Sequence, residues 1–260
     1  MIEFRRVVKS DIFSILSLYK ECFNLDFSAK EYNYLNEDED KDYFSMVAVA
    51  DGKIIAHNSI IKNIYKFNSK DIVVGVSSGG MVSTEYSGVF YPLLKKQFKA
   101  FAGDIIIAFP NENSAPFFTK LFKFNIIHTN YFNLDLKNFK KSYKVSTSSE
   151  FGRTNGFIVK RIDKHPKNKY QKIEKGNRIL IYKQYGEEID IMYCSHFDDF
   201  LLDTISLLAN QGYNSFNMVH WDLEYVKEIG FKPIKNNIFV YKAFNEEIHF
   251  QPQMIDSDVF

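Results

Sequence analysis

The sequence predicts an α/β (α+β) fold, with a central mixed, mostly antiparallel sheet flanked by helices. Residues 104–124 join a short apolar run, a Pro-Asn turn and a segment with helical spacing of apolar residues, which is typical of a buried strand followed by a helix. The pair Asp51-Gly52 separates two long apolar-rich segments and indicates a β-hairpin. Similar strand and helix signals occur on both sides of a polar stretch at residues 138–156.

The first half predicts elements in the order β, α, β, β, β, α, β, α, β. Its strands are expected at residues 2–7, 44–50, 53–67, 71–84, 105–109 and 124–136. Its helices are expected after a Ser10 cap, over residues 89–102, and after the Pro110-Asn111 turn, where Ser114 or Asn113 can cap the first turn. The polar, acidic residues 26–42 are expected to form a loop or a second short helix.

The second half repeats this order in shorter form. We expect a hairpin around Gly186, with strands at residues 178–185 and 187–195, followed by a helix at 197–210. A strand at 213–220, a short helix at 223–229 and a last strand at 237–244 complete this half. The segment ending in Gly230-Phe231 parallels the one ending in Lys123-Phe124. We therefore expect domains at residues 1–137 and 157–260, joined by a linker at 138–156. An unrelated α+β domain is the alternative for the second half.

Composition narrows the classes of function. The 260-residue chain is 45% hydrophobic, which fits a globular protein long enough for two domains. The net charge is +1 and the Lys and Arg residues are dispersed, apart from a modest Lys cluster at 137–144, which argues against a nucleic-acid partner. No apolar run is long enough to span a bilayer, and residues 1–6 lack the apolar core of a secretion signal.

The two cysteines, Cys22 and Cys194, are far apart and neither belongs to a CxxC pair. They suit a reducing compartment, so we expect a cytoplasmic protein with two buried thiols. The chain has no HExxH or Cys/His spacing typical of a metal site, and no phosphate-binding Walker loop. The sequence therefore predicts no metal cofactor.

The strand–turn–helix at 104–124 resembles the second cofactor motif of the GCN5-related N-acetyltransferases. Asn111, Ser114, Phe118 and Leu121 match the family's Asn-x-x-small-x-x-x-aromatic-x-x-Leu pattern. The order of elements over residues 1–136 also matches the family's fold. The resemblance implies that two neighbouring strands part near Met81 and Phe109, and that acetyl-CoA or another acyl-CoA binds in the gap. The second half would then be a reduced domain of the same fold. An ordinary βα unit with a Pro-Asn turn is the alternative.

In the family, a loop with the pattern Arg/Gln-x-x-Gly-x-Gly/Ala binds the coenzyme pyrophosphate at a helix amino terminus, where partial positive charge favours an anion. The corresponding segment here is residues 80–94, and Gly88 takes the position of the last glycine. The resemblance implies pyrophosphate binding by the backbone amides of Ser87, Gly88, Val89 and Phe90. The family's arginine and first glycine are absent, and Glu85 lies where it would repel a phosphate.

The resemblance also implies the chemistry of the site. Backbone N–H groups near Met81 and Val82, with Ser83 beside them, would polarise the thioester carbonyl. Phe118 replaces a tyrosine that protonates the departing thiolate in many members of the family, so a nearby Tyr, a Ser or water must do so here. His57 and Glu85 are the candidate general bases, and the alternatives are a structural histidine and a solvated carboxylate.

We therefore expect an acyl-CoA-dependent N-acyltransferase, with an N-acetyltransferase favoured, that acts on a small-molecule amine. An amino sugar of surface polysaccharide synthesis is the favoured acceptor, and His220-Trp221 could stack on a sugar or belong to the core. Two other classes stay open. One is a non-catalytic binding module of the same fold. The other is a Fem-like aminoacyl-tRNA-dependent transferase, which predicts a basic groove and a coiled-coil arm. The sequence leaves the oligomeric state undetermined.

Overall fold

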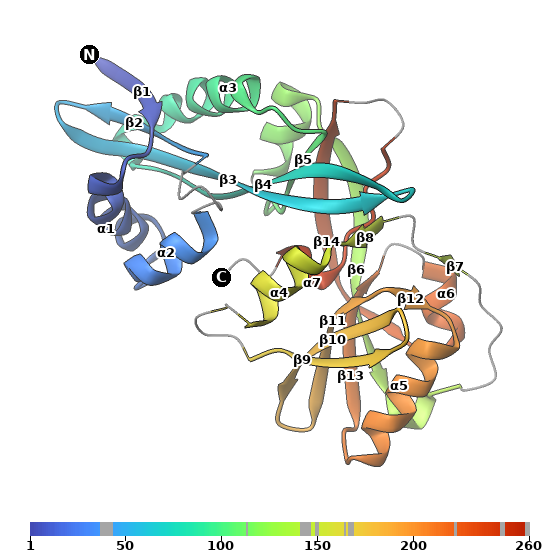
Figure 1. Ribbon diagram of the computed structural model, residues 1–260. Coiled ribbons are helices and arrows are strands. Elements are labelled where there is room, and N and C mark those ends of the chain that lie inside the picture. Colours follow the sequence, from blue (N-terminus) through green and yellow to red (C-terminus); the bar gives the residue numbers. More distant parts are fainter. Residues whose placement is uncertain are drawn as a thin grey trace.

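The computed structural model describes residues 1–36, 44–112, 114–140, 147–148, 151–163, 165, 169–220, 223–244 and 248–257. It is built around one large mixed sheet, mostly antiparallel, with helices on its faces, as the sequence predicts (Figure 1). The strands of this sheet follow the order β1-β2-β3-β4-β5-β14-β6-β13-β11-β10-β9, and β8 pairs with β3 outside this path. A separate small sheet pairs β12 with β7.

The first half has the predicted order of elements. In chain order they are β1 (Ile2–Arg6), α1 (Ile12–Phe23), α2 (Ala29–Asn36), β2 (Ser45–Ala50), β3 (Lys53–Phe67), β4 (Lys70–Val82), the 3-10 turn η2 (Thr84–Val89), α3 (Phe90–Ala100), β5 (Ile105–Ala108), the helical turn η3 (Phe117–Leu121) and β6 (Asn125–Asp135).

The second half contains the predicted elements and several additional ones. In chain order they are β7 (Thr147–Ser148), β8 (Phe151–Arg153), α4 (Asn155–Asp163), β9 (Gln171–Lys175), β10 (Arg178–Tyr185), β11 (Glu188–Cys194), β12 (His196–Phe197), α5 (Asp199–Asn210), β13 (Ser215–His220), α6 (Leu223–Glu228), β14 (Lys232–Ala243) and α7 (Met254–Ser257). The sequence pattern did not indicate β8, α4, β9 or α7.

The centre of the sheet is arranged symmetrically about the pair β6/β14. On one side, β4 and β5 are parallel and β5 pairs with β14; on the other side, β11 and β13 are parallel and β13 pairs with β6. The pair β6/β14 is itself antiparallel. The last strand of each half therefore lies beside the parallel pair of the other half. The hydrogen-bonded backbone is continuous through both halves, and the domain limits expected from the sequence stay a prediction.

Helices cover both faces of the first half because the side chains of β2 alternate between them. Val47 packs against α1 and α2 together with Ile54 and Met81. Met46 and Ala48 point the other way and pack against α3. In the second half, α5 and α6 cover β10, β11 and β13 with the cluster around Phe200, Leu201 and Val226.

Two helix starts differ from the prediction. The chain enters α1 through a 3-10 turn, and the Asp11 carboxylate, not the Ser10 hydroxyl, accepts the Val8 N–H at 2.8 Å. Before η3, the Asn111 side chain accepts the Ser114 N–H at 2.9 Å, so Asn111 and not Ser114 acts as the cap. Asn113 and residues 37–43 lie outside the described residues.

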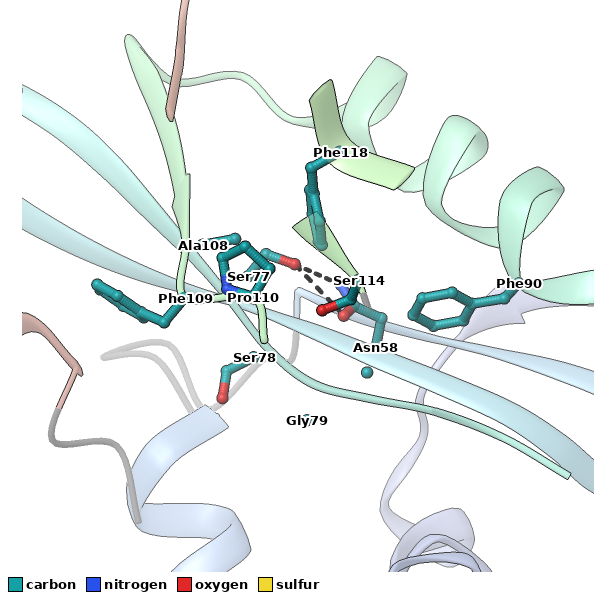
Figure 2. Close-up of a pocket in the computed structure, with 11 residues that line it drawn as sticks. Asn58, Ser77, Ser78, Gly79, Phe90, Ala108, Phe109, Pro110, Ser114 and Phe118 are labelled. Atoms are coloured by element: carbon teal, nitrogen blue, oxygen red, sulfur yellow. Dashed lines mark hydrogen bonds between the residues drawn. The ribbon is translucent and has the colours of Figure 1, made fainter. Parts of the chain in front are cut away.

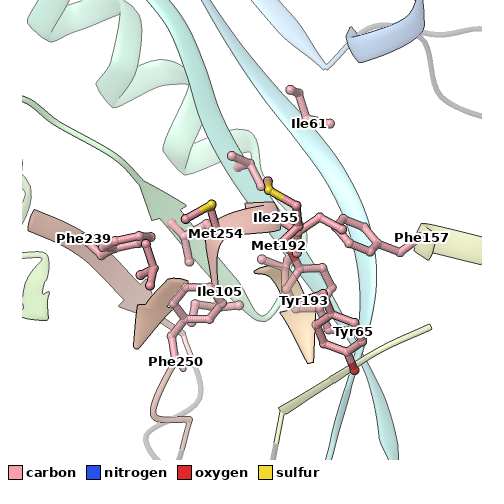
Figure 3. Packing of buried hydrophobic residues seen from close by; sticks show 14 of the residues in the cluster. Ile61, Tyr65, Ile105, Phe157, Met192, Tyr193, Phe239, Phe250, Met254 and Ile255 are labelled. Atoms are coloured by element: carbon pink, nitrogen blue, oxygen red, sulfur yellow. The ribbon is translucent and has the colours of Figure 1, made fainter. Parts of the chain in front are cut away.

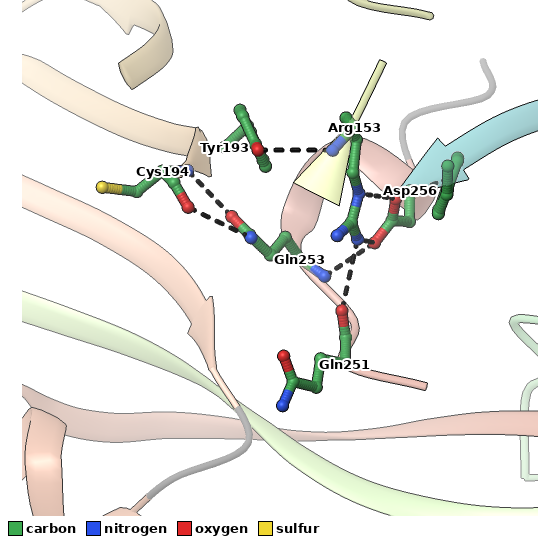
Figure 4. A network of polar contacts seen from close by, with 7 residues as sticks. Arg153, Tyr193, Cys194, Gln251, Gln253 and Asp256 are labelled. Carbon is green, nitrogen blue, oxygen red and sulfur yellow. Dashed lines mark hydrogen bonds and ion pairs between the residues drawn. The ribbon is translucent and has the colours of Figure 1, made fainter. Parts of the chain in front are cut away.

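The closing segment, residues 248–257, is part of the main core. Ile248, Phe250, Met254 and Ile255 pack with strands of both halves (Figure 3). The Asp256 carboxylate forms an ion pair with Arg153, and both side chains are fully buried. It also accepts the Gln253 N–H at 2.8 Å (Figure 4). The Tyr65 hydroxyl donates to the same carboxylate at 2.8 Å.

Arg153 lies within the polar stretch expected to act as a linker, on β8, and pairs with Tyr65 of β3. Its guanidinium lies 4.7 Å from the Tyr65 ring centroid and donates to Gln251 O at 3.2 Å. Burial opposes the charge of Arg153, but Asp256 outweighs it and raises the pKa of the guanidinium. The ion pair therefore joins the closing segment to the first half of the sheet.

Asp256→Asn should destabilise the protein strongly, by about 3–5 kcal/mol, because it leaves a buried, uncompensated guanidinium. Asp71→Asn is the matched control, since the Lys66–Asp71 pair is exposed and its loss should cost less than about 1 kcal/mol. Urea unfolding of both variants measures the difference. Equal stability of the two would show that the buried pair does not hold the closing segment.

Lys123 is the middle one of the three residues between η3 and β6, and it has a φ of 58° where the equivalent Gly230 has 104°. Left-handed backbone strains a residue with a Cβ, so Lys123→Gly should stabilise the protein by about 1 kcal/mol. Lys120→Gly, within η3, should instead destabilise it by a similar amount. Thermal unfolding compares the two, and a lower Tm for Lys123→Gly would contradict the argument.

Candidate functional site

The parallel strands β4 and β5 part from one another halfway along β4. Their pairing runs from Val74 opposite Ile105 to Ser77 opposite Ala108, and β4 continues to Val82 without β5. The chain turns away after Ala108 at Pro110, which has no N–H to continue the ladder. The separation of strands predicted near Met81 and Phe109 is therefore confirmed.

A β-bulge reshapes β4 at the same place. His57 of β3 lies opposite Met81, but Ser59 lies opposite Ser78, so β4 has one extra residue around Gly79 and Gly80. Gly79 has a φ of +60°, and a Cβ there would overlap the Tyr19 hydroxyl. A Cβ on Gly80 would lie 2.8 Å from the Phe90 ring. Gly79 thus favours glycine through its left-handed backbone, and at both positions a neighbouring side chain approaches the backbone closely.

A cavity of about 280 Å³ occupies the gap between the strands (Figure 2). Its walls come from β3, from the bulge of β4, from the start of α3 and from the segment after β5. The lining residues are Asn58, Ser77, Ser78, Gly79, Gly80, Phe90, Ala108, Phe109, Pro110, Ser114 and Phe118. Aromatic rings and short hydroxyl side chains thus line one site, a combination that suits a small ligand with apolar and polar parts.

A buried polar network supports one wall of the cavity. Asn58 Nδ2 donates to Gln97 Oε1 at 2.7 Å and lies 3.2 Å from Ser77 Oγ. Gln97 Nε2 in turn donates to the Asn58 and Phe44 carbonyls, both at 3.0 Å. Gln97 is 0% exposed, so α3 is fixed against β3 through these bonds. Asn58 and Gln97 were not among the residues predicted from the sequence, although the Gly79-Gly80 pair within a strand pattern signals a bulge beside them.

The edge of β4 that β5 leaves carries backbone groups directed into this region. Ser83 N donates to Ile55 O at 2.8 Å, so Ser83 and Ile55 form a hydrogen-bonded pair. Because such pairs alternate in an antiparallel ladder, Val82 opposite Ala56 directs its N–H and C=O away from β3. The Val82 carbonyl accepts the Cys22 thiol at 3.6 Å. Met81, opposite His57, is the next position along the same ladder and directs its N–H and C=O towards β3, so of these two residues Val82 presents its backbone at the free edge.

The expected pyrophosphate loop forms η2 and the start of α3. Ser87 and Gly88 are exposed, Val89 is buried, and Phe90 lines the cavity. A Cβ on Gly88 would meet open space, so this position does not require glycine for steric reasons. The Ser83 hydroxyl donates to Glu21 at 2.9 Å instead of capping η2. Glu85 is exposed in the first turn of η2, outside the cavity lining.

The residues of the motif after β5 have two structural roles, since one caps the helical turn and others line the cavity. Asn111 caps the turn, whereas Ser114 and Phe118 line the cavity. The Phe118 ring packs 5.4 Å from the Phe124 ring, which anchors η3 at the start of β6. Leu121 is exposed. The structure thus brings Ser114, Phe118 and Phe90 to one cavity, while the binding roles predicted for these residues stay predictions.

His57 is fully buried behind the bulge. Its Nδ1 lies 3.0 Å from Gly79 O and its Nε2 lies 3.0 Å from the Tyr32 hydroxyl. A carbonyl only accepts, so Nδ1 carries the proton and Nε2 accepts from Tyr32. Burial lowers the pKa of His57 from 6.5 to about 4, and the bond to Gly79 opposes this only in part. His57 therefore stays neutral near pH 7 and positions the Gly79 carbonyl; its role as a base stays a prediction.

The other sequence candidates lie away from the cavity. The buried His220 ring packs 4.5 Å from Phe197 in the second half, and Trp221 lies outside the described residues. Among the described residues, no group of His, Cys, Asp and Glu is arranged to hold a metal ion. In the same part of the chain, no helix is long and apolar enough to cross a membrane.

No model of a known protein family and no curated protein matches the sequence. Solved structures do match the fold. A protein of Enterococcus faecalis described as a probable N-acyltransferase gives a TM-score of 0.70 at 10% identity, over 94% of this chain and 72% of that one. A GCN5-related N-acetyltransferase of Kribbella flavida gives 0.68 at 9% identity, over 94% and 72%.

A third similar structure is the glucosamine N-acetyltransferase region of a fungal multi-domain β-N-acetylglucosaminidase, with a TM-score of 0.53 at 12% identity over 93% of this chain and 38% of that one. The fold of this chain is therefore that of the GCN5-related N-acetyltransferases, as the sequence resemblance implied. At these identities the similarity concerns the fold.

The buried, neutral His57 should make folding stability depend on pH. Because its pKa is about 4 when folded and 6.5 in the unfolded chain, only the unfolded state gains the proton between these values. The contribution of neutral His57 to the free energy of unfolding is complete above pH 6.5 and is lost as the pH falls towards 4. The free energy of unfolding should fall by at most about 1.4 kcal/mol per pH unit for this reason.

Urea unfolding from pH 7.5 to 4 in the native protein and in His57→Gln measures this slope. The glutamine variant keeps a donor for Gly79 O but does not titrate, so its curve should be flatter over this interval. Identical slopes in the two proteins would contradict the assignment of the neutral, buried histidine.

Proposed function

We propose that this protein is an acyl-CoA-dependent N-acyltransferase whose thioester binds in the gap between β4 and β5. The observation that carries the proposal is the coincidence of three features at one place: the end of the β4–β5 ladder, the glycine bulge of β4 and the cavity between them. The fold similarity to N-acetyltransferases supports the same assignment. Acetyl-CoA is the favoured donor.

The cavity has room for the narrow end of an acyl-CoA, since about 280 Å³ lies at the lower end of small-molecule sites. The Val82 N–H, directed away from β3, would polarise the thioester carbonyl and stabilise its developing negative charge. The nucleotide end would extend towards η2, where backbone amides at a helix start favour an anion. Glu85 weakens that interaction, as does the absence of an arginine.

The reaction requires a neutral amine to attack the carbonyl carbon, after which the C–S bond breaks and the thiolate leaves. Phe118 cannot donate a proton to that thiolate. Among the residues lining the cavity, Ser77, Ser78 and Ser114 carry hydroxyl groups. These hydroxyls would hydrogen-bond the leaving sulfur or relay a proton from water. A water molecule would carry the amine proton away, because His57 is separated from the cavity by the Gly79 carbonyl.

We propose an amino sugar as the acceptor. Such an acceptor presents one amine among several hydroxyl groups, and the hydroxyls of the lining serines match this chemistry. The similar fold of a glucosamine N-acetyltransferase region supports this choice.

A non-catalytic binding module is the second candidate. Phe118 in place of tyrosine and the degenerate pyrophosphate loop favour it. Thiol release from acetyl-CoA in the presence of glucosamine separates the two, because a binding module would bind the coenzyme without consuming it.

Ser114→Trp should weaken acetyl-CoA binding at least about tenfold, because the indole would fill the cavity that Ser114 lines. Lys120→Trp is the control, since Lys120 is exposed on η3, shortly after Ser114, and does not line the cavity. Isothermal titration calorimetry measures both. No saturable binding of acetyl-CoA at millimolar concentration to the unmodified protein would overturn the proposal.

A further inference from the structure

The second half of the sheet repeats the backbone arrangement of the site between β4 and β5, in which a parallel pairing ends early beside a β-bulge. The parallel pairing of β11 with β13 ends at Ile191 opposite Met218, and β11 continues to Cys194 without β13. Along β10, Ile181 lies opposite Tyr193 but Tyr182 lies opposite Ile191, so β11 has one extra residue, as β4 does. A bulge followed by a free edge thus occurs once in each half.

The backbone polarity of the two edges is also the same. Ser195 N donates to Ile179 O at 2.9 Å, as Ser83 N donates to Ile55 O at 2.8 Å. Cys194, opposite Leu180, therefore occupies the position of Val82 and directs its N–H and C=O away from β10.

In the second half, the closing segment occupies this edge. Gln253 Oε1 accepts the Cys194 N–H at 2.8 Å, and Gln253 Nε2 donates to Cys194 O at 3.2 Å (Figure 4). One carboxamide thus pairs with both backbone groups of one residue. Gln253 is 2% exposed and Cys194 is 0% exposed, so this pairing excludes water and any external ligand.

Neighbouring residues fix the carboxamide in place. The Gln253 N–H donates to Asp256, whose carboxylate is held by Arg153 and Tyr65. Met254 and Ile255 are buried beside it, in the cluster that includes Met192 and Tyr193 of β11 (Figure 3). The occupant therefore belongs to the core.

We infer that Gln253 is an intramolecular ligand of a second amide-binding strand edge, and that the chain consequently binds one acyl-CoA, not two. The arm of coenzyme A contains amides, and an extended amide pairs with a strand edge through one donor and one acceptor, as the Gln253 carboxamide does. The number of coenzymes rests on the proposed function. The amide site itself does not.

Two measurements test this inference. Calorimetric titration of the unmodified protein with acetyl-CoA should give one equivalent, and Ser114→Trp should abolish it. Two equivalents would overturn the inference, because the second edge would then be accessible. If no acetyl-CoA binds, the proposed function is overturned. The amide site is then tested by the second measurement alone.

The second measurement is chemical rescue. Gln253→Gly should lower the Tm, and 0.1 M acetamide should restore part of the loss, because the free amide replaces the missing carboxamide. Gln251→Gly, two residues earlier, keeps its backbone carbonyl bond to Arg153 and should show no gain from acetamide. Equal responses of the two variants to acetamide would overturn the amide site.

Gln253→Met covers the case in which the glycine variant does not fold, since methionine keeps the length of the side chain without the amide. Its Cys194 N–H should exchange with deuterium at least tenfold faster than in Gln251→Met. Equal exchange rates at Cys194 in the two variants would contradict the role given to Gln253.

Discussion

The end of the β4–β5 ladder is the constraint on which the candidate site depends. Parallel strands normally use every backbone N–H and C=O along their shared length, and here that use stops at Ser77 and Ala108. Pro110 prevents β5 from continuing, and the bulge at Gly79 turns β4. The gap and the cavity follow from this interruption, which also leaves the Val82 backbone without a partner strand on the side away from β3.

The same sheet joins the two halves of the chain on either side of the interrupted ladder. The two halves contribute β6 and β14 to the centre, so each parallel pair borders a strand of the other half. The Arg153–Asp256 pair then joins the closing segment to β3. A buried ion pair of this kind ties the halves together because breaking it would leave an uncompensated charge in the core.

The edges of β4 and β11 have the same backbone geometry, but one borders a cavity and the other is occupied by a side chain. At β4 the bulge consists of Gly79 and Gly80, and both line a cavity together with Asn58, Phe90 and Ser114. At β11 the bulge contains the buried Met192, and the Gln253 carboxamide fills the remaining hydrogen-bonding positions. Side-chain volume and one amide thus separate an open site from a closed one.

The sequence by itself determined the order of strands and helices, since apolar spacing and turn residues such as Asp51-Gly52 are local signals. It also located the parting of β4 and β5, because Pro110 and Asn111 act on their immediate neighbours. Only the tertiary structure decided that β14 lies between β5 and β6, that His57 is buried, and that Gln253 reaches Cys194. These contacts join residues far apart in the chain, and their energies depend on packing and desolvation that no local pattern records.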